Sequence, residues 1–224
     1  MAQLNHKSEN AAPALFPLFL KLEGRECLVV GAGSVAEGKI RSLLASGAKV
    51  RVVALEAKDA VRQWAQAGEV AWEARAFQAS DLDGVVLAIA ATSSPSVNAA
   101  VFVEARKRNV LCNAVDDPEN CDFYYGAVVR RGDLQIAIST AGHSPALAQR
   151  LRQELEEQFT AEYSDWVKAL GEARQQLFAL DMDPEQRRRL LHEMTSAGPG
   201  GIGAGQGDAE KAAMPEAKEV MHAR

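Results

Sequence analysis

The stretch LVVGAGSVAEGK, residues 28–39, decides the fold. Three apolar residues lead into Gly31, Gly33 and Ala36, and apolar residues at helical spacing follow them. In a strand–turn–helix unit, the first glycine allows the tight turn and the second lets a ligand phosphate approach the backbone. A small third residue then lets the helix pack closely on the strand. The motif therefore predicts a dinucleotide-binding turn, and the alternative is a helix–sheet contact without a ligand.

The residues on either side of this stretch alternate between strand-like and helical patterns. Strand-like runs lie at 26–30, 49–55, 84–92 and 110–115, with a weaker one at 70–77 that we expect at a sheet edge. Helical runs lie between them at 35–45, 56–68 and 95–109. Such alternation predicts βαβ units with right-handed crossovers. The expected fold class is α/β, with a Rossmann-like doubly wound parallel sheet.

The pattern changes after Val115. Two strand-like runs surround RRGD at 130–133, which predicts a hairpin, and helical spacing begins at Ser144, with Pro145 at the first helical position. We expect a Rossmann domain with an N-terminal arm over 1–115 and a small α+β segment over 116–150. A helical domain over 151–195 and a disordered tail over 196–224, rich in Gly and Ala, complete the expected organisation.

Composition excludes several classes of protein. The net charge of −5 argues against a nucleic-acid partner, and no apolar run approaches the roughly 18 residues of a membrane helix. Pro13 and Pro17 interrupt the apolar N-terminal stretch, which argues against a signal peptide. Three cysteines without a C-x-x-C spacing are typical of reduced thiols, with Cys27 and Cys112 packed in strands. We therefore expect a cytoplasmic protein.

The glycine turn predicts where a dinucleotide would bind. Its phosphates would lie at the helix N-terminus, against the N–H groups of Ser34 and Val35. An acidic residue about 20 positions further on binds the ribose hydroxyls in such folds, and Glu56 occupies that place. Glu56 favours NAD over NADP because it would repel a 2′-phosphate, although Lys58 weakens this inference. Thr92, which follows the strand at 84–92, is either a cofactor neighbour or, like Ser93, a cap of the next helix.

Several motifs in a fixed order resemble one family. They are GAGSVAEGK, AATSSPSVN, NAVDDP, CDF and ISTAGHSPALA, within a match from about Phe16 to Phe159. This combination resembles the precorrin-2 dehydrogenase / sirohydrochlorin ferrochelatase family, which includes the N-terminal region of siroheme synthase. The resemblance implies NAD-dependent oxidation of precorrin-2 to sirohydrochlorin and, in many members, insertion of Fe²⁺ as a substrate to give siroheme. It also implies a homodimer, with the segment 116–150 contributing to dimerisation and to the active site.

The resemblance also assigns roles to individual residues. Asp116, in NAVD, corresponds to the functional aspartate of the family, and Leu55 and Glu56 correspond to NAD contacts after the second strand. Thr140 corresponds to a hydroxyl residue that is serine, and can be phosphorylated, in the bacterial fused enzyme. The loop with His143 and Ser144 lines the tetrapyrrole cleft in the family. His143 departs from the common pattern, and it either alters metal delivery or is a loop residue facing solvent.

The chemistry of the reaction agrees with these assignments. A carboxylate at Asp116 can act as general base and can hold iron transiently, while the sequence predicts no permanent metal site. Precorrin-2 carries many carboxylates, so arginines such as Arg130, Arg131, Arg150 and Arg152 are candidates to bind it. The alternative for each arginine is a solvated face paired with nearby glutamates. Two other functions stay open: a dehydrogenase without chelatase activity, and a non-enzymatic NAD-sensing module.

Overall fold

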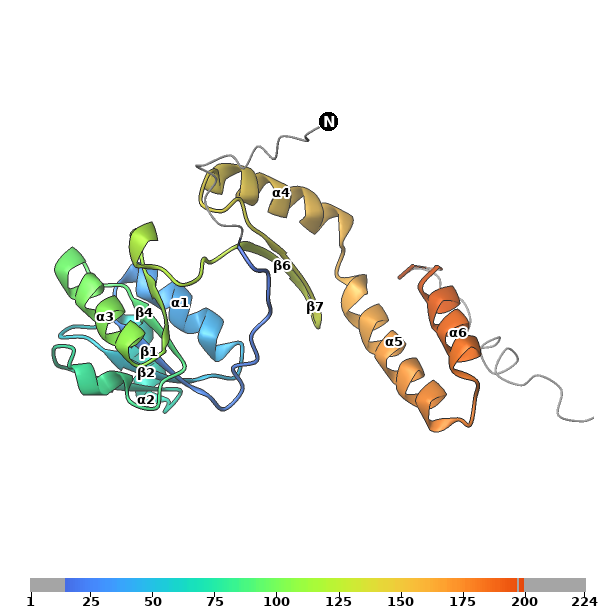
Figure 1. Cartoon of the computed structure of the whole chain (residues 1–224), viewed down its shortest axis with the longest axis horizontal. Coiled ribbons are helices and arrows are strands. Elements are labelled where there is room, and N and C mark those ends of the chain that lie inside the picture. Colours follow the sequence, from blue (N-terminus) through green and yellow to red (C-terminus); the bar gives the residue numbers. More distant parts are fainter. Residues whose placement is uncertain (1–14, 197, 200–224) are drawn as a thin grey trace, which may run out of the picture. The chain divides into compact units, whose positions relative to one another are not determined.

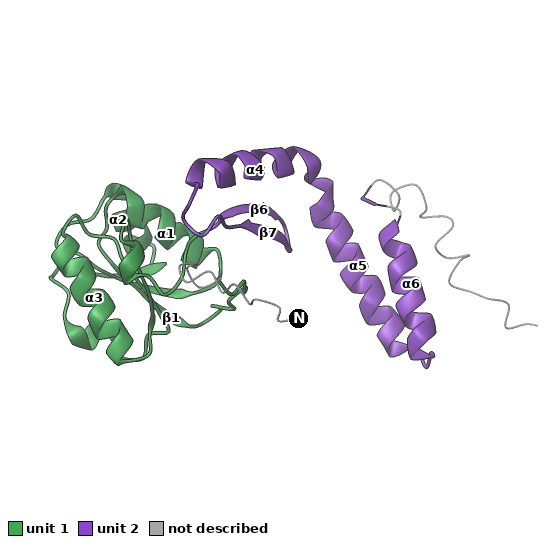
Figure 2. Cartoon of the chain, turned by 45° about the horizontal axis from the view of Figure 1, so that its top comes forward, with its two compact units in different colours: residues 1–125 green, residues 126–224 purple. Residues whose placement is uncertain are grey.

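The computed structural model describes residues 15–196 and 198–199 (Figure 1). The chain divides into two compact units, residues 1–125 and 126–224 (Figure 2). The first unit contains a five-stranded sheet, and the second contains a hairpin and three helices within the described residues. Almost all of the tail expected at 196–224 lies outside the described residues, as does the start of the arm.

The first unit alternates strands and helices, as the sequence predicts. Its strands are β1 (Glu26–Val30), β2 (Lys49–Val53), β3 (Val70–Glu73), β4 (Leu87–Ala90) and β5 (Leu111–Ala114). Its helices are α1 (Ser34–Leu44), α2 (Asp59–Gln66) and α3 (Pro95–Lys107), with 3₁₀ turns η1 (Ala79–Leu82) and η2 (Pro118–Asn120).

All five strands are parallel, in the order β3-β2-β1-β4-β5. The expected Rossmann-like sheet is confirmed, and the run at 70–77 supplies the edge strand. In the register, Val30 at the end of β1 pairs with Val53 of β2 and Ala90 of β4. The chain therefore reverses its strand order beside β1, where ligands bind in doubly wound sheets.

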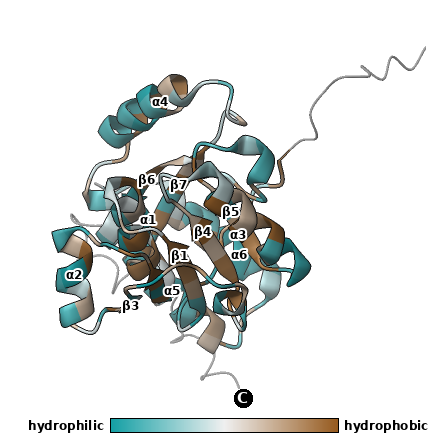
Figure 3. Ribbon diagram, turned by 90° about the vertical axis from the view of Figure 1, so that its left-hand side faces the viewer, coloured by the Kyte–Doolittle hydropathy of each residue, from teal (hydrophilic) through white to brown (hydrophobic). Residues whose placement is uncertain are grey.

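Helices cover both faces of this sheet because its strands are apolar on both sides. On one face Val29 packs with Ile40 of α1 and Val61 of α2. On the other face Leu28 packs with Val101 of α3. Figure 3 shows the apolar colour concentrated on β1 and β4, with hydrophilic residues on the outer surface of α2.

The two strand cysteines, Cys27 and Cys112, are buried and free, as expected. Burial disfavours the thiolate, which raises the pKa of Cys27 to about 11 and that of Cys112 to about 12. These thiols therefore pack as small apolar side chains rather than react.

The second unit begins with the expected hairpin. Strands β6 (Ala127–Arg131) and β7 (Leu134–Ile138) are antiparallel, and Gly132 has φ +56° in the turn between them. The helices α4 (Pro145–Gln158), α5 (Glu162–Ala179) and α6 (Pro184–Ser196) follow. Ser144 caps α4 by accepting a hydrogen bond from the N–H of Leu147 at 3.3 Å, which confirms the predicted start of this helix.

Arg131 attaches the hairpin to the end of α4. Its guanidinium donates to the carbonyl oxygens of Glu156 at 3.0 Å and Phe159 at 2.7 Å. Helix C-terminal carbonyls lack intrahelical donors, so a cation there stabilises the helix end. The role of Arg131 is therefore structural in this unit.

Candidate functional site

The two glycines of the turn differ in what surrounds them. Gly31 has φ +108°, and a Cβ added to it would lie 2.7 Å from the carbonyl carbon of Ala91. The close approach of the residues after β4 therefore requires glycine at this position. A Cβ added to Gly33 would meet nothing within 4 Å. Gly33 leaves open space in front of α1, and the fold itself does not need that space.

The N-terminus of α1 presents free donors to this space. The first intrahelical bond runs from the N–H of Glu37 to the carbonyl of Gly33, so the preceding N–H groups have no helical acceptor. Ser34 and Val35 are exposed, whereas Ala36 is fully buried against the sheet. This is the arrangement that the three motif positions predict, with exposed backbone donors at a helix N-terminus, where anions are favoured.

The loop after β2 lies against the glycine turn. The backbone N–H of Lys58 donates to the carbonyl of Ala32 at 3.1 Å, and Lys58 Nζ donates to Ser34 Oγ at 2.6 Å. Leu55 and Glu56 are exposed in this loop. Glu56 lies three residues beyond the end of β2 rather than on the strand itself. The side chains expected to contact a dinucleotide are therefore at one edge of the sheet.

Thr92 follows β4 at the same edge, where its hydrogen bonds stabilise the local loop. Its hydroxyl donates to Oδ1 of the buried Asn98 at 2.7 Å and accepts from the N–H of Ser94 at 3.1 Å. The cap of α3 is Ser94, which accepts from the N–H of Val97. Thr92 thus positions the loop beside Gly31, and Ser93 is not the cap residue.

Asp116 follows β5 at the carboxyl end of the sheet and is exposed. Its φ is +60°, a left-handed conformation that aspartate tolerates better than most residues. Within the described residues, its carboxylate has no hydrogen bond and no cation within 4.0 Å. It is therefore a free carboxylate at the same edge of the sheet as the glycine turn.

The segment after Asp116 is held to β5 by polar contacts. The side-chain amide of Asn113 donates to the carbonyl of Phe123 at 2.8 Å, and Cys121 Sγ donates to the carbonyl of Ala114 at 3.1 Å. The carboxylate of Asp122 accepts a hydrogen bond from the N–H of Cys112 at 3.0 Å, so Asp122 stabilises the local structure. These contacts fix the backbone on both sides of Asp116.

Lys39 is a residue near Asp116 to which the sequence analysis gave no role. Its Nζ lies 3.4 Å from the centre of the Tyr125 ring, a cation–π contact. Burial lowers the pKa of Lys39, while the nearby charge of Asp116 and the Cys121 thiol oppose that shift. Lys39 thus adds positive charge beside the free carboxylate. Only the folded chain brings Lys39 and Tyr125 together, so no sequence signal could have found this pair.

The remaining predicted site residues belong to the second unit. Thr140 Oγ1 accepts from the N–H of Ser144 at 3.1 Å, and the Thr140 carbonyl accepts from the N–H of His143 at 2.9 Å. His143 is exposed at the tip of this turn. The turn is therefore internally hydrogen-bonded, with the imidazole directed to no partner among the described side chains.

The candidate arginines make mostly local contacts. Arg150 pairs with Glu154 at 3.1 Å on the exposed face of α4, and Arg152 pairs with Glu156 at 2.5 Å. Arg130 contacts Gln135 at 3.5 Å across the hairpin and is otherwise exposed. The exposed pair of Arg150 contributes little to stability, so the guanidinium groups of Arg130 and Arg150 are available to an anionic ligand at small cost. Arg152 is half-buried in its pair.

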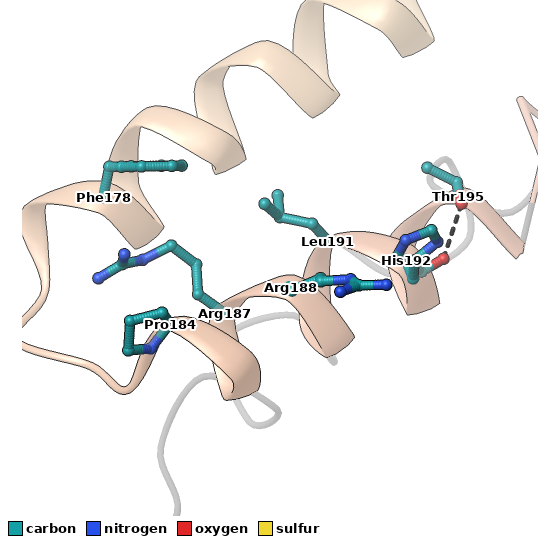
Figure 4. Close-up of a pocket in the computed structure, with 7 residues that line it drawn as sticks. All are labelled: Phe178, Pro184, Arg187, Arg188, Leu191, His192 and Thr195. Atoms are coloured by element: carbon teal, nitrogen blue, oxygen red, sulfur yellow. Dashed lines mark hydrogen bonds between the residues drawn. The ribbon is translucent and has the colours of Figure 1, made fainter.

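A pocket lies elsewhere, between α5 and α6 (Figure 4). It is lined by Phe178, Pro184, Arg187, Arg188, Leu191, His192 and Thr195. Arg187 donates to the carbonyls of Leu177 and Met182 and so stabilises the turn between the two helices. The pocket contains none of the residues predicted from the sequence.

Two kinds of feature are absent from the part of the chain that the structure describes. No group of three or more His, Cys, Asp or Glu side chains there could hold a metal ion. No helix of that part has the length and apolar composition needed to cross a membrane.

Comparison with known proteins gives two consecutive family matches. A model of NAD(P)-binding domains matches residues 18–127, and a model described as the central part of sirohaem biosynthesis proteins matches residues 131–158. The first match spans the glycine turn and Asp116, and the second spans the Thr140–Ser144 loop and α4.

Individual relatives agree with these matches. Siroheme synthase 1 of Serratia proteamaculans is 41% identical over 72% of this chain, and siroheme synthase of Methylococcus capsulatus is 37% identical over 88%. The chain spans only 34% and 41% of the length of these two relatives. The solved structure of SirC, a precorrin-2 dehydrogenase, matches with a TM-score of 0.71 at 29% identity, over 81% of this chain and 89% of SirC. The fold, the glycine turn and both family matches thus agree, and the chain belongs to the family of the siroheme synthase NAD(P)-binding and central regions and of SirC.

Proposed function

We propose that this protein oxidises precorrin-2 to sirohydrochlorin, with NAD⁺ as hydride acceptor, in siroheme biosynthesis. The observation that carries the proposal is the free, exposed carboxylate of Asp116 at the same sheet edge as the open glycine turn. SirC, which has the named activity, supports it, because the match covers 89% of that enzyme.

Different residues of the chain would bind the cofactor and accept the proton. The N–H groups of Ser34 and Val35 would hold the pyrophosphate, and Glu56 would accept hydrogen bonds from the ribose hydroxyls. When bound, NAD⁺ supplies the acceptor for the hydride that leaves the substrate. Asp116 would accept the one proton that the macrocycle releases as it is oxidised, and would then pass this proton to solvent.

The macrocycle's carboxylates would be bound by cations. Lys39 beside Asp116 supports this, as do Arg130 and Arg150 in the second unit, since guanidinium groups bind carboxylates well. Thr140, His143 and Ser144 are proposed as further substrate contacts, on the basis of the family resemblance of their loop.

The test is anaerobic incubation of the protein with precorrin-2 and NAD⁺, following the absorbance of sirohydrochlorin. Asp116→Asn removes the charge but keeps a residue that tolerates the left-handed backbone. We expect its rate to fall at least about 100-fold, as for loss of a general base, with unchanged NAD⁺ affinity. The exposed neighbouring acid offers a matched control, Glu119→Gln, which should turn over normally. Full turnover by Asp116→Asn would remove the proposed base.

We further propose insertion of Fe²⁺ into sirohydrochlorin as a second activity. The uncommitted carboxylate of Asp116 supports it, because an oxygen ligand holds Fe²⁺ weakly enough to release it to the macrocycle. Purified sirohydrochlorin with Fe²⁺ or Co²⁺ tests this. A rate no greater than the spontaneous one would leave a dehydrogenase alone, and absence of both activities with NAD⁺ binding intact would favour an NAD-sensing module.

Two properties of the whole protein belong to the same proposal. We infer a homodimer, supported by the exposed apolar side chains of the arm that precedes β1. A cytoplasmic location is supported by the three free cysteines.

A further inference from the structure

We propose that Lys58, together with Ser34, forms a phosphate contact of the dinucleotide site. The inference rests on the proposed cofactor binding and adds to it a cation from the loop after β2. Neither the glycine turn nor the ribose-binding acid requires a lysine at this position.

The geometry of Lys58 and Ser34 is the first argument. Lys58 Nζ donates to Ser34 Oγ at 2.6 Å, although Lys58 lies in the loop after β2 and Ser34 lies in α1. Ser34 is the first residue of α1, where the free N–H groups face the open space at Gly33. The ammonium is therefore held directly beside the place where a phosphate fits.

The direction of this hydrogen bond is the second argument. Because Ser34 Oγ accepts from the ammonium, its own proton must go to another acceptor. Among the described residues, neither that proton nor the remaining two protons of Lys58 Nζ has a partner. Three side-chain donors and the N–H groups of Ser34 and Val35 are thus left for one acceptor-rich ligand. A phosphate, with several anionic oxygens, matches this set of donors.

The position of Lys58 is fixed, which limits the entropy lost on binding. Its backbone N–H is bonded to the carbonyl of Ala32 at 3.1 Å, and its neighbour Ala57 is buried in the core. Lys58 also directly precedes α2 in extended conformation. The loop therefore holds the side chain over the turn before any ligand arrives.

Nearby acids do not neutralise Lys58. Glu56 and Asp59 are close in sequence, yet within the described part of the chain no carboxylate lies within 4.0 Å of Lys58 Nζ. Glu37, the other acid near the turn, pairs with Arg41 at 2.8 Å. The positive charge at Lys58 is thus available to an anion.

A dinucleotide has two kinds of phosphate that fit this contact. The pyrophosphate is common to NAD⁺ and NADP⁺, whereas the ribose 2′-phosphate is present only in NADP⁺. Glu56, exposed two residues before Lys58, would repel a 2′-phosphate, and Lys58 would attract one. A comparison of the two dinucleotides therefore distinguishes the two sources.

Calorimetry of the full chain with NAD⁺ and with NADP⁺, without any tetrapyrrole, tests the inference. We expect Lys58→Met to raise the Kd about tenfold for any dinucleotide that uses the contact, and Lys58→Arg to stay within about threefold of the wild type. An equal loss for both dinucleotides assigns the contact to the pyrophosphate. A larger loss for NADP⁺ assigns it to the 2′-phosphate.

Two controls separate this inference from the proposed cofactor site. Lys49→Met removes an exposed lysine from the opposite end of β2 and should bind as the wild type does. Gly33→Asp should abolish binding. Wild-type affinity of Lys58→Met for both dinucleotides, with binding lost in Gly33→Asp, would overturn the Lys58 contact alone. Failure of the unaltered chain to bind either dinucleotide would overturn both proposals.

Discussion

At the scale of single residues, the glycine turn combines a requirement of folding with a requirement of binding. Gly31 is enclosed by the backbone after β4, whereas Gly33 borders open space. The motif assigns the first glycine to the tight turn and the second to the approach of a phosphate, and these surroundings agree with that assignment. The surroundings of each α-carbon therefore decide whether an added side chain would impair folding or ligand binding.

This difference predicts that matched alanine substitutions at Gly31 and Gly33 have unequal effects on stability. Gly31→Ala forces a side chain onto backbone at φ +108° and should lower the free energy of unfolding by roughly 2–3 kcal/mol, measured by urea denaturation. Gly33→Ala, at φ −82°, should change it by less than about 0.5 kcal/mol. Gly33→Asp should fold normally and lose NAD⁺ binding, measured by calorimetry. Equal destabilisation by the two alanines would contradict this account.

Some contacts of the candidate site could be predicted from the sequence and others could not, for a physical reason. The placement of Gly31, Gly33 and Ala36 in a strand–turn–helix unit was predictable because it depends on the backbone of one local turn. The hydrogen bonds of Thr92 with Asn98, and the contact of Lys39 with Tyr125, depend on how separate segments meet. The spacing of residues along the sequence does not determine such contacts between separate segments.

At the scale of elements, an ionic cluster stabilises the edge of the sheet. Asp81, in η1, is buried and accepts from Arg75 at 2.6 Å and from the N–H of Gln78 at 2.8 Å. The hydrogen bonds from Arg75 are the largest cause that lowers the pKa of Asp81. Arg51 of β2 adds a bond to the Asp81 carbonyl at 2.5 Å. The buried Asp81 thus connects the segment after β3 to β2, through its carboxylate to Arg75 and through its backbone carbonyl to Arg51.

This cluster predicts a dependence of stability on pH. A carboxyl whose folded pKa is depressed stabilises the fold above its unfolded pKa, and the contribution is lost as the pH falls through the folded pKa. Asp81→Asn should therefore cost about 2–3 kcal/mol at pH 7, and its deficit relative to the wild type should shrink below about pH 4.

Urea denaturation between pH 3 and 7 measures this effect. Asp83→Asn is the control, because Asp83 is exposed and its pair with Arg108 should contribute little. A deficit of Asp81→Asn that stays constant across this range would show that the carboxylate charge is not responsible.

The helices and strands themselves were predictable to a large extent. Their apolar spacing and their start signals, such as Ser144–Pro145, depend on neighbouring residues. The bonds from Arg131 to the end of α4 were not predicted, because the sequence offered Arg131 as an anion-binding candidate or as part of a solvated face paired with glutamates. A guanidinium offers the same donors to carbonyls and to carboxylates, and only the folded hairpin determines which it meets.

At the scale of the whole molecule, the arm that precedes β1 exposes several large apolar side chains to solvent. Phe16 is 83% exposed and Phe19 is 69% exposed, with Leu15, Leu18 and Leu20 also exposed. Burial of one such side chain contributes about 1.5–3 kcal/mol. A second copy of the chain could supply that burial, as the proposed homodimer requires.

Light scattering after size-exclusion chromatography tests this. We expect a mass of twice 24.1 kDa at micromolar concentration. The double variant Phe16→Ser, Phe19→Ser should shift the protein toward the monomer while its far-UV circular dichroism is unchanged. A wild-type mass of one chain would contradict the homodimer.

The left-handed backbone at Asp116 sets the thermal stability of the fold against the presence of a carboxylate at this position. A glycine there would relieve the conformational penalty that φ +60° imposes on a residue with a side chain. A chain optimised only to resist heat would thus give up the aspartate. The contacts that hold the neighbouring segment to β5 offset this penalty. The protein therefore retains Asp116 at the cost of some of its stability.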